Sequence, residues 1–189
     1  MFLFLEIAAV TFAITYLFLA MKQNIMCWYA AFLSTLIYTV IYWDVALYME
    51  SLLNIYYLFM AVYGWINWNN KSEISENFIL SWSIRKHFVA ISLIVFLTII
   101  SGFYLSYTDA VRPYLDSFTT WGSIITTYMV TQKVLSNWIF WIVINSVGLY
   151  LNYDRELYLT VFLLLIYQVI SIYGYYQWRK SYNEYTQEN

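Results

Sequence analysis

Seven long apolar runs, separated by short polar breaks, make up most of the chain. A helix needs about 20 apolar residues to cross the hydrocarbon core of a bilayer. The runs predict spanning helices at about residues 2–20, 25–43, 45–68, 87–106, 117–132, 136–152 and 156–178. They are apolar throughout and do not alternate in polarity, which excludes the strands of a membrane barrel. The pattern therefore predicts an all-α integral membrane protein with seven transmembrane helices.

The first three runs and the last three share an internal repeat. A shift of 110 residues places 6–68 over 116–178 without a gap, and the boundaries of the runs coincide. The matches fall on residue types that chance rarely pairs. They are Glu6 with Asp116, Trp28 with Trp138, Asp44 with Asp154, Tyr48 with Tyr158, Tyr57 with Tyr167, Tyr63 with Tyr173, Gly64 with Gly174, and Trp68 with Trp178. We infer a three-helix unit that occurs twice.

The fourth run lies between the two copies and sets their relative direction. Three spans alone would leave the second copy upside down, and a fourth span restores its direction. We therefore expect two parallel three-helix bundles joined by a linker helix (3+1+3), as in sugar carriers of the SWEET type. The expected divisions are a first bundle at 1–68, a cytoplasmic loop with linker helix 4 at 69–115, a second bundle at 116–178, and a cytoplasmic tail at 179–189.

The basic residues are unevenly divided between the two sides of the predicted bundle. One side carries Arg112 and Arg155, and the other carries Lys22, Lys71, Arg85, Lys86, Lys133, Arg179 and Lys180. Because Lys and Arg favour the cytoplasmic side, we expect a bacterial inner-membrane protein with its N-terminus outside and its C-terminus in the cytoplasm. Trp68 and Trp178 would then anchor their spans at the cytoplasmic interface. Gly64 and Gly174 would mark points of close helix approach.

The composition supports a membrane setting and excludes several classes of protein. Hydrophobic residues make up 62% of the chain and charged ones 11%, whereas a soluble domain carries about 25% charged residues. With a net charge of -2 and no basic patch, a nucleic-acid partner is not expected. Aromatic residues reach 23%, more than a lipid-facing shell requires, so some rings are expected to line a cavity or to bind a flat molecule.

Motifs of catalysis and of cofactor binding are missing from the sequence. The five glycines are not clustered into a phosphate-binding loop, and no H-E-x-x-H motif occurs. Cys27 is the single cysteine, which excludes a disulfide and a cysteine-based metal site. His87 follows Arg85 and Lys86, and we expect it on the surface in a polar loop. We expect neither an enzyme nor a cofactor.

Polar residues inside the predicted spans indicate a binding site, since lipid penalises them unless they are satisfied. Glu50, Asn54 and Tyr57 follow one face of the third span at helical spacing. The second unit offers different groups: Asn145 and Gln168 at mid-depth, Trp141 on the same helix face as Asn145, and Trp121 in the outer half of the fifth span. Bonding of Glu50 and Asn54 to neighbouring helices is the structural alternative. Two unlike walls suit an unsymmetrical organic substrate better than water or ions.

The kinds of side chain in this set favour a small, planar, cationic molecule that contains nitrogen. A carboxylate complements a positive charge, and amides bond to hydroxyl groups or ring nitrogens. Aromatic faces attract a cationic ring.

The chain resembles the PnuC-type vitamin transporters over nearly its whole length. The resemblance is carried by YGWINW at 63–68, by KVLSNWIFWIVIN at 133–145, and by the final span with Gly174 and Trp178. It implies a SWEET-like fold, a homotrimer, and vitamin uptake by facilitated diffusion without ion coupling. It also implies a functional link to a cytoplasmic vitamin kinase, which traps the substrate inside the cell by phosphorylation.

Within this family, the resemblance favours thiamine over nicotinamide riboside. The nicotinamide riboside branch typically has Gln at the position of Asn54 and Asn at that of Ala61, and lacks an acid at that of Glu50. The thiazolium charge and aminopyrimidine of thiamine suit a carboxylate and an amide. Nicotinamide riboside stays the alternative, as does proton coupling through Glu50. A membrane protein with a structural or signalling role, without transport, is the alternative from another class.

Overall fold

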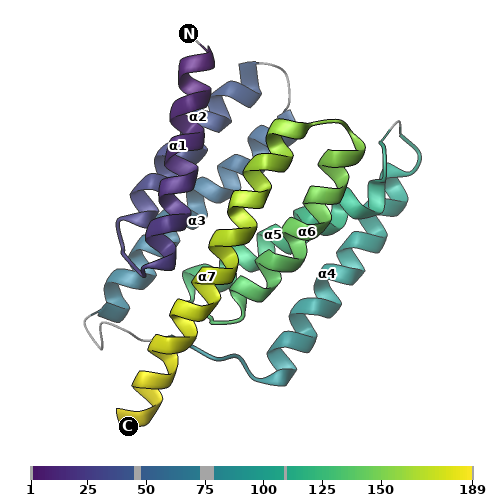
Figure 1. Ribbon diagram of the computed structural model, residues 1–189. Coiled ribbons are helices and arrows are strands. Elements are labelled where there is room, and N and C mark those ends of the chain that lie inside the picture. Colours follow the sequence, from purple (N-terminus) through teal and green to yellow (C-terminus); the bar gives the residue numbers. More distant parts are fainter. Residues whose placement is uncertain (1, 45–47, 73–78, 109, 189) are drawn as a thin grey trace.

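The computed structural model describes residues 2–44, 48–72, 79–108 and 110–188, and helices account for nearly all of them (Figure 1). The helices are α1 (Phe2–Met21), α2 (Cys27–Asp44), α3 (Tyr48–Ser72), α4 (Ile84–Leu105), α5 (Pro113–Thr131), α6 (Asn137–Asp154) and α7 (Tyr158–Glu188). Each lies on one of the seven apolar runs. The prediction of an all-helical chain is therefore confirmed for the described residues. The predicted tail at 179–188 continues α7 as a helix.

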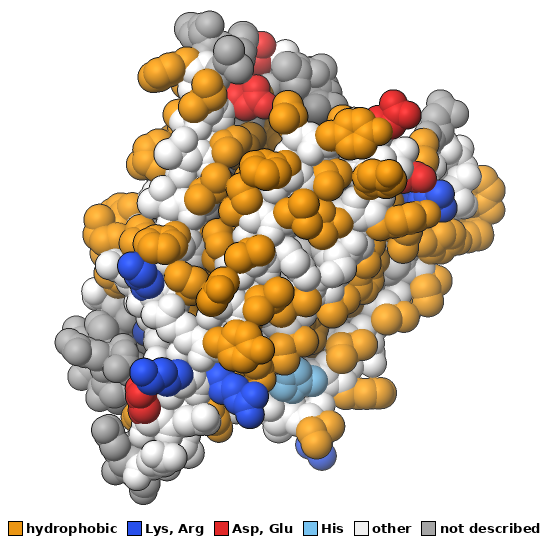
Figure 2. Space-filling view, viewed as in Figure 1, with side chains coloured by type: hydrophobic (Ala, Val, Ile, Leu, Met, Phe, Trp, Pro, Cys, Tyr) orange, Lys and Arg blue, Asp and Glu red, His pale blue; other side chains and the backbone are white. Residues whose placement is uncertain are grey.

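Three of the described helices are apolar and long enough to cross a membrane, over Phe4–Met21, Ile84–Leu105 and Tyr158–Gln187. Figure 2 shows hydrophobic side chains spread over much of one face of the molecule, as expected for a surface in contact with lipid tails. The remaining helices are shorter or more polar. In α5 and α6 the difference comes from Ser, Thr and Asn residues, several of which face the interior of the molecule.

Six of the helices form a closed ring (Figure 1). Helices α1, α2 and α3 contact one another in chain order, and so do α5, α6 and α7. The ring is completed by contacts of α3 with α5 and of α1 with α7. Helix α4 packs along α5 at the periphery. This arrangement leaves room for a central cavity bounded by both units of the repeat.

The two halves share local backbone geometry as well as sequence. Gln23 and Lys133, which are 110 positions apart, have positive φ values of 56° and 53° in the turns after α1 and α5. In the first turn the Asn24 amide donates to Leu19 O at 2.9 Å, and in the second the Val134 amide donates to Met129 O at 3.0 Å. The same left-handed residue and the same hydrogen bond thus redirect the chain in both units.

Trp68 and Trp178 occupy the protein core. Their exposed fractions are 1% and 0%, so the prediction that they anchor the spans at the membrane interface is wrong. They lie 6.0 Å apart between ring centroids and join the two halves of the ring of helices. Each indole N–H donates to a backbone carbonyl of the other unit, which satisfies the polar atom without water. Here a buried carbonyl accepts the hydrogen bond from the indole N–H that water or lipid head groups would accept at the membrane interface.

His87 also differs from its prediction as a surface residue in a polar loop. Helix α4 begins at Ile84, so His87 belongs to its first turn and is half-buried. Its Nε2 atom lies 2.7 Å from Ser136 Oγ in the turn between α5 and α6. The ring also packs near Trp82 and Phe140. His87 therefore ties the start of α4 to the second unit.

Candidate functional site

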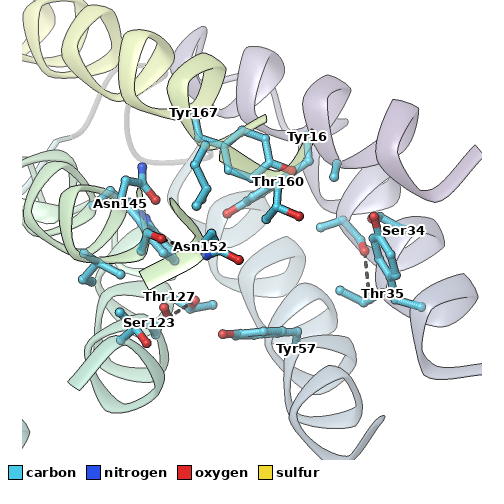
Figure 3. Close-up of a pocket in the computed structure, with 18 of the residues that line it drawn as sticks. Tyr16, Ser34, Thr35, Tyr57, Ser123, Thr127, Asn145, Asn152, Thr160 and Tyr167 are labelled. Atoms are coloured by element: carbon cyan, nitrogen blue, oxygen red, sulfur yellow. Dashed lines mark hydrogen bonds between the residues drawn. The ribbon is translucent and has the colours of Figure 1, made fainter. Parts of the chain in front are cut away.

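A cavity of about 440 Å³ lies inside the ring of helices, and all six ring helices contribute to its wall (Figure 3). This volume falls within the range of roughly 300–1,000 Å³ that is usual for small-molecule sites. Among the described residues, Asp116 and Arg155 mark one end of the cavity, and Trp28, Ala61 and Trp141 lie toward the other. A small organic molecule fits such a space.

One wall of the cavity is a stripe of polar residues on α5. Asp116, Thr119, Ser123 and Thr127 follow each other at intervals of three or four, which places them on one face of the helix. Thr119 Oγ1 donates to Asp116 O at 2.9 Å, and Thr127 Oγ1 donates to Ser123 O at 2.8 Å. Because these hydroxyls donate to their own helix, their lone pairs face a ligand as acceptors. Sequence reasoning missed this stripe, although its helical spacing was visible.

Tyrosine rings from both units face the cavity. Tyr57 on α3 and Tyr167 on α7 are repeat mates, and Figure 3 shows them on facing sides of the space. Tyr16 on α1 also lines the cavity and packs against Trp28, with 6.0 Å between the ring centroids, and Ser123 on α5 interacts with the Tyr57 hydroxyl. Aromatic faces on two sides favour a flat guest that lies between them. Tyr57 was predicted to bind the substrate, and the structure places it in the wall of the cavity.

Two amides on α6 complete the polar part of the wall. Asn145 is 6% exposed, and its Nδ2 atom lies 3.4 Å from Ser171 Oγ on α7. This contact is long for a hydrogen bond, so Asn145 retains bonding capacity for a ligand. Asn152, two turns further along α6, donates to Gly148 O at 2.8 Å. These amides add donors and acceptors to the hydroxyls of α5.

Ion pairs join the helix ends at one end of the cavity. Arg155, which follows α6, pairs with Asp116 of α5, and both line the cavity. Arg112 precedes α5, and its Nε atom lies 2.8 Å from Asp154 Oδ2 at the end of α6. The charges at this end are thus compensated in pairs, and the pairs tie α5 to α6.

The Arg112–Asp154 pair predicts a dependence of stability on pH. Hydrogen bonds from Arg112 lower the pKa of Asp154, so the pair stabilises the fold above the unfolded-state pKa of about 3.9. This contribution is lost as the pH falls through the lower folded-state pKa. In detergent at low salt, the Tm of the wild type should exceed that of Asp154→Asn near neutral pH, and the difference should vanish in acid. A difference that persists unchanged to about pH 3 would contradict this role of the pair.

Three of the residues predicted for the site lie in the cavity wall, namely Tyr57, Trp141 and Asn145. Trp121 does not, because its Nε1 atom donates to Ser101 Oγ on α4 at 3.0 Å. Trp121 stands two positions from both Thr119 and Ser123. At about 100° per residue it therefore points away from the face of α5 that lines the cavity.

The remaining predicted residues have other surroundings. Gln168 packs between α7 and α6, where its Nε2 atom donates to Ser146 Oγ at 3.3 Å. Gln168 follows the cavity residue Tyr167 in the sequence, so its side chain leaves the helix about 100° further around the axis of α7. Asn54 is half-buried on α3 but lies outside the cavity wall. The side chain of Glu50 falls outside the described part of the structure.

A ring of helices with an apolar exterior, around a central cavity lined by aromatic, aliphatic, hydroxyl and amide side chains, is typical of a membrane transporter of small molecules. Comparison with known proteins gives the family. The sequence model described as "Nicotinamide mononucleotide transporter" matches residues 3–180. The chain belongs to this family of PnuC-type transporters.

Individual relatives agree with this assignment. The chain is 24% identical to the nicotinamide riboside transporter PnuC of Escherichia coli K12, with 88% of this chain and 81% of the relative covered. It is 22% identical to the riboflavin/roseoflavin transporter RibM of Streptomyces davaonensis, over 63% of this chain and 58% of the relative. The crystal structure of the vitamin B3 transporter PnuC superimposes with a TM-score of 0.77 at 21% identity, covering 96% of this chain and 83% of that one.

These relatives are transporters, so the prediction that the chain is not an enzyme is confirmed. Their shared class is the transport of vitamins or closely related molecules, and the chain is accordingly a vitamin-type transporter. The structural likeness supports the fold, and the substrate must be argued from the cavity.

Proposed function

We propose that the protein carries nicotinamide riboside across the cytoplasmic membrane by facilitated diffusion with alternating access. The observation that carries the proposal is a cavity with aromatic rings from both units and hydroxyl and amide groups on the second. A cationic pyridinium ring between aromatic faces gains roughly 2 kcal/mol when it is desolvated. The ribose hydroxyls match the acceptors of α5, and the carboxamide matches Asn145.

The names of the relatives support a ligand of this type. Nicotinamide riboside and riboflavin, which the two relatives carry, both join a flat nitrogen heterocycle to a polyhydroxylated chain or ring. A cavity with rings on facing sides and a stripe of hydroxyls on a third suits that combination. Thiamine has a single hydroxyl group and makes less use of the stripe on α5.

Thiamine is the second candidate, because residues on α3 differ from those expected in the nicotinamide riboside branch. Ala61 lies in the cavity wall at the position where the nicotinamide riboside branch is expected to have Asn. Glu50 and Asn54 precede Tyr57 at helical spacing on α3, and their repeat mates Thr160 and Leu164 line the cavity from α7. A carboxylate at Glu50 would complement the thiazolium charge.

We propose the orientation from the distribution of basic residues and the assembly from the family resemblance. In Figure 2, Lys and Arg gather mainly toward the C-terminal end of the molecule, which the positive-inside rule places in the cytoplasm. The end of the cavity with Asp116 and Arg155 then faces outward. In this proposal the bundles 1–68 and 116–178 rock about the linker helix, the protein forms a homotrimer, and a cytoplasmic vitamin kinase traps the substrate.

Uptake into proteoliposomes tests the proposal. The purified protein should take up labelled nicotinamide riboside down its gradient, and unlabelled nicotinamide riboside should compete better than thiamine. An imposed pH gradient should not change the initial rate, because facilitated diffusion moves no coupled proton. Glu50→Gln should leave nicotinamide riboside uptake near the wild-type value.

The other outcomes separate the candidates. If thiamine competes better and Glu50→Gln abolishes its uptake, thiamine is the substrate and the carboxylate binds it. If uptake follows the pH gradient, the transporter is proton-coupled. If neither vitamin enters the vesicles, both substrate assignments fail.

A further inference from the structure

Four tryptophans pack against one another near the end of the cavity that lies opposite Asp116 and Arg155. Trp28, Trp68, Trp138 and Trp178, which we call the tryptophan quartet, have exposed fractions of 2%, 1%, 1% and 0%. Trp28 and Trp68 meet edge to face at 5.3 Å and 87°, and Trp138 and Trp178 do so at 5.4 Å and 87°. Trp28 also lines the cavity, so the quartet begins at this end of the cavity and extends beyond it into the core.

Two members of the quartet form hydrogen bonds that connect the two units. Trp68 Nε1 on α3 donates to Val130 O of α5 at 3.1 Å, and Trp178 Nε1 on α7 donates to Ala20 O of α1 at 3.1 Å. Ala20 and Val130 are themselves repeat mates. Each third helix therefore bonds to the end of the first helix of the other unit. Both bonds must break if the units separate at this end.

The other two members carry buried polar atoms without a partner among the described residues. Trp28 Nε1 and Trp138 Nε1 are both buried and make no hydrogen bond there. Such orphaned donors are rare in native proteins and destabilise the state that buries them. The packed quartet therefore contains two hydrogen bonds that favour this state and two unpaired N–H donors that oppose it, and the repeat relates the members of each pair.

We propose that the tryptophan quartet is the inner gate of the transporter. Separation of the two units at this end breaks the bonds of Trp68 and Trp178 and lets water reach Trp28 Nε1 and Trp138 Nε1. The opposing contributions keep the closed and open states close in free energy, which a carrier needs in order to cycle. This inference rests on the alternating access of the proposed function, but it does not depend on which vitamin is carried.

Cys27 is a natural reporter of this gate. It is the single cysteine of the chain, it is fully buried, and it packs in the same core cluster as the quartet. Its repeat mate, Asn137, is equally buried beside Trp138. A thiol reagent reaches Cys27 when the gate opens, so the alkylation rate reports the open fraction.

The test replaces single tryptophans by benzothienylalanine, which keeps the shape of the ring and removes the N–H donor. The full-length protein, in detergent and without substrate, is treated with a small maleimide. Replacement of Trp68 or Trp178 removes a bond of the closed state and should raise the Cys27 alkylation rate about fivefold, the effect of one hydrogen bond. Replacement of Trp138 removes an orphan and should lower the rate by a similar factor. Trp28 is left unchanged because it neighbours Cys27.

The opposite signs make the proposal falsifiable. If all three variants change the rate in the same direction, ring packing rather than hydrogen bonding controls the opening. If native Cys27 never reacts while the unfolded protein does, the gate lies elsewhere. Cys27→Ser serves as the blank for labelling. Vitamin uptake is measured in a separate assay. If the substrate assignment fails, the labelling pattern of the variants can still hold. If the labelling pattern fails, uptake of the vitamin can still be observed.

Discussion

Alanine at Gly64 or Gly174 should lower the Tm of the protein, although alanine favours helices. A Cβ atom at Gly64 would lie 2.4 Å from two atoms of the Trp28 ring, and one at Gly174 would lie 2.7 Å from the Trp138 ring. Overpacking of this kind costs about 1–3 kcal/mol and exceeds the gain of about 1 kcal/mol in helix propensity. A net loss of up to about 2 kcal/mol corresponds to a decrease in Tm of several degrees, at roughly 2–4 °C per kcal/mol.

Gly148→Ala is the matched control. Its new Cβ atom would lie 3.4 Å from Leu164 Cδ1, an ordinary van der Waals distance. The gain in helix propensity is therefore not opposed, and the Tm should stay the same or rise slightly. Equal Tm values for Gly64→Ala and Gly148→Ala would mean that the Trp28 ring moves aside without cost. The rigid packing of the tryptophan quartet would then be refuted.

These glycines also refine what the repeat predicts. The sequence indicated that Gly64 and Gly174 mark points of close helix approach. The structure places an indole ring of the same unit, Trp28 or Trp138, against each glycine. The matching pairs of Gly and Trp were visible in the 110-residue offset, but their contact was not. A match between two positions of the repeat indicates that their environments are alike. It does not identify which residue each position contacts.

The helices could be predicted well because their signal is the length of apolar runs. The direction in which a side chain points is harder to predict in a membrane protein. In a soluble helix the polar face indicates the outside, whereas here both lipid and core favour apolar groups. Trp68 and Trp178 were assigned to the interface because tryptophan is common there. Their indole N–H groups instead have buried carbonyl partners that lie more than 60 residues away.

The same difficulty divides the predicted site residues. Asn145 and Tyr57 were found because an amide or hydroxyl at mid-depth in a span requires a polar neighbour. Trp121 also has a polar neighbour, but that neighbour is Ser101 of α4 and lies outside the cavity. Thr119, Ser123 and Thr127 were overlooked because hydroxyls in membrane helices can bond to their own backbone, as two of them do here. Their common face was the usable signal.

The repeat explains why the two walls of the cavity differ. Tyr57 and Tyr167 keep the same ring at equivalent positions, while Asn145 has Thr35 as its mate and Trp141 has Ala31. The duplicated scaffold fixes where a side chain enters the cavity, and divergence between the copies sets its chemistry. A site on the axis of two unlike halves can bind a ring on one side and a sugar on the other.

Replacement of Asn145 by Leu should weaken vitamin binding by roughly 10- to 100-fold, because a polar group of the ligand would be left unpaired in the cavity. Asn145 is buried in the cavity wall, and its contact with Ser171 is long. The dissociation constant would be measured by titration calorimetry of the protein in detergent, with nicotinamide riboside and with thiamine. The Tm of the variant would be recorded to separate lost binding from lost folding.

Gln168→Leu is the matched change of an amide outside the cavity wall, where the side chain bonds to Ser146. It should alter binding by less than about threefold, even if the protein loses some stability from the broken contact. A larger effect at Gln168 than at Asn145 would place the vitamin between α6 and α7 and would refute the central cavity as the site. Comparable losses at both positions would mean that α6 and α7 rearrange around the ligand, since one rigid cavity does not present both amides.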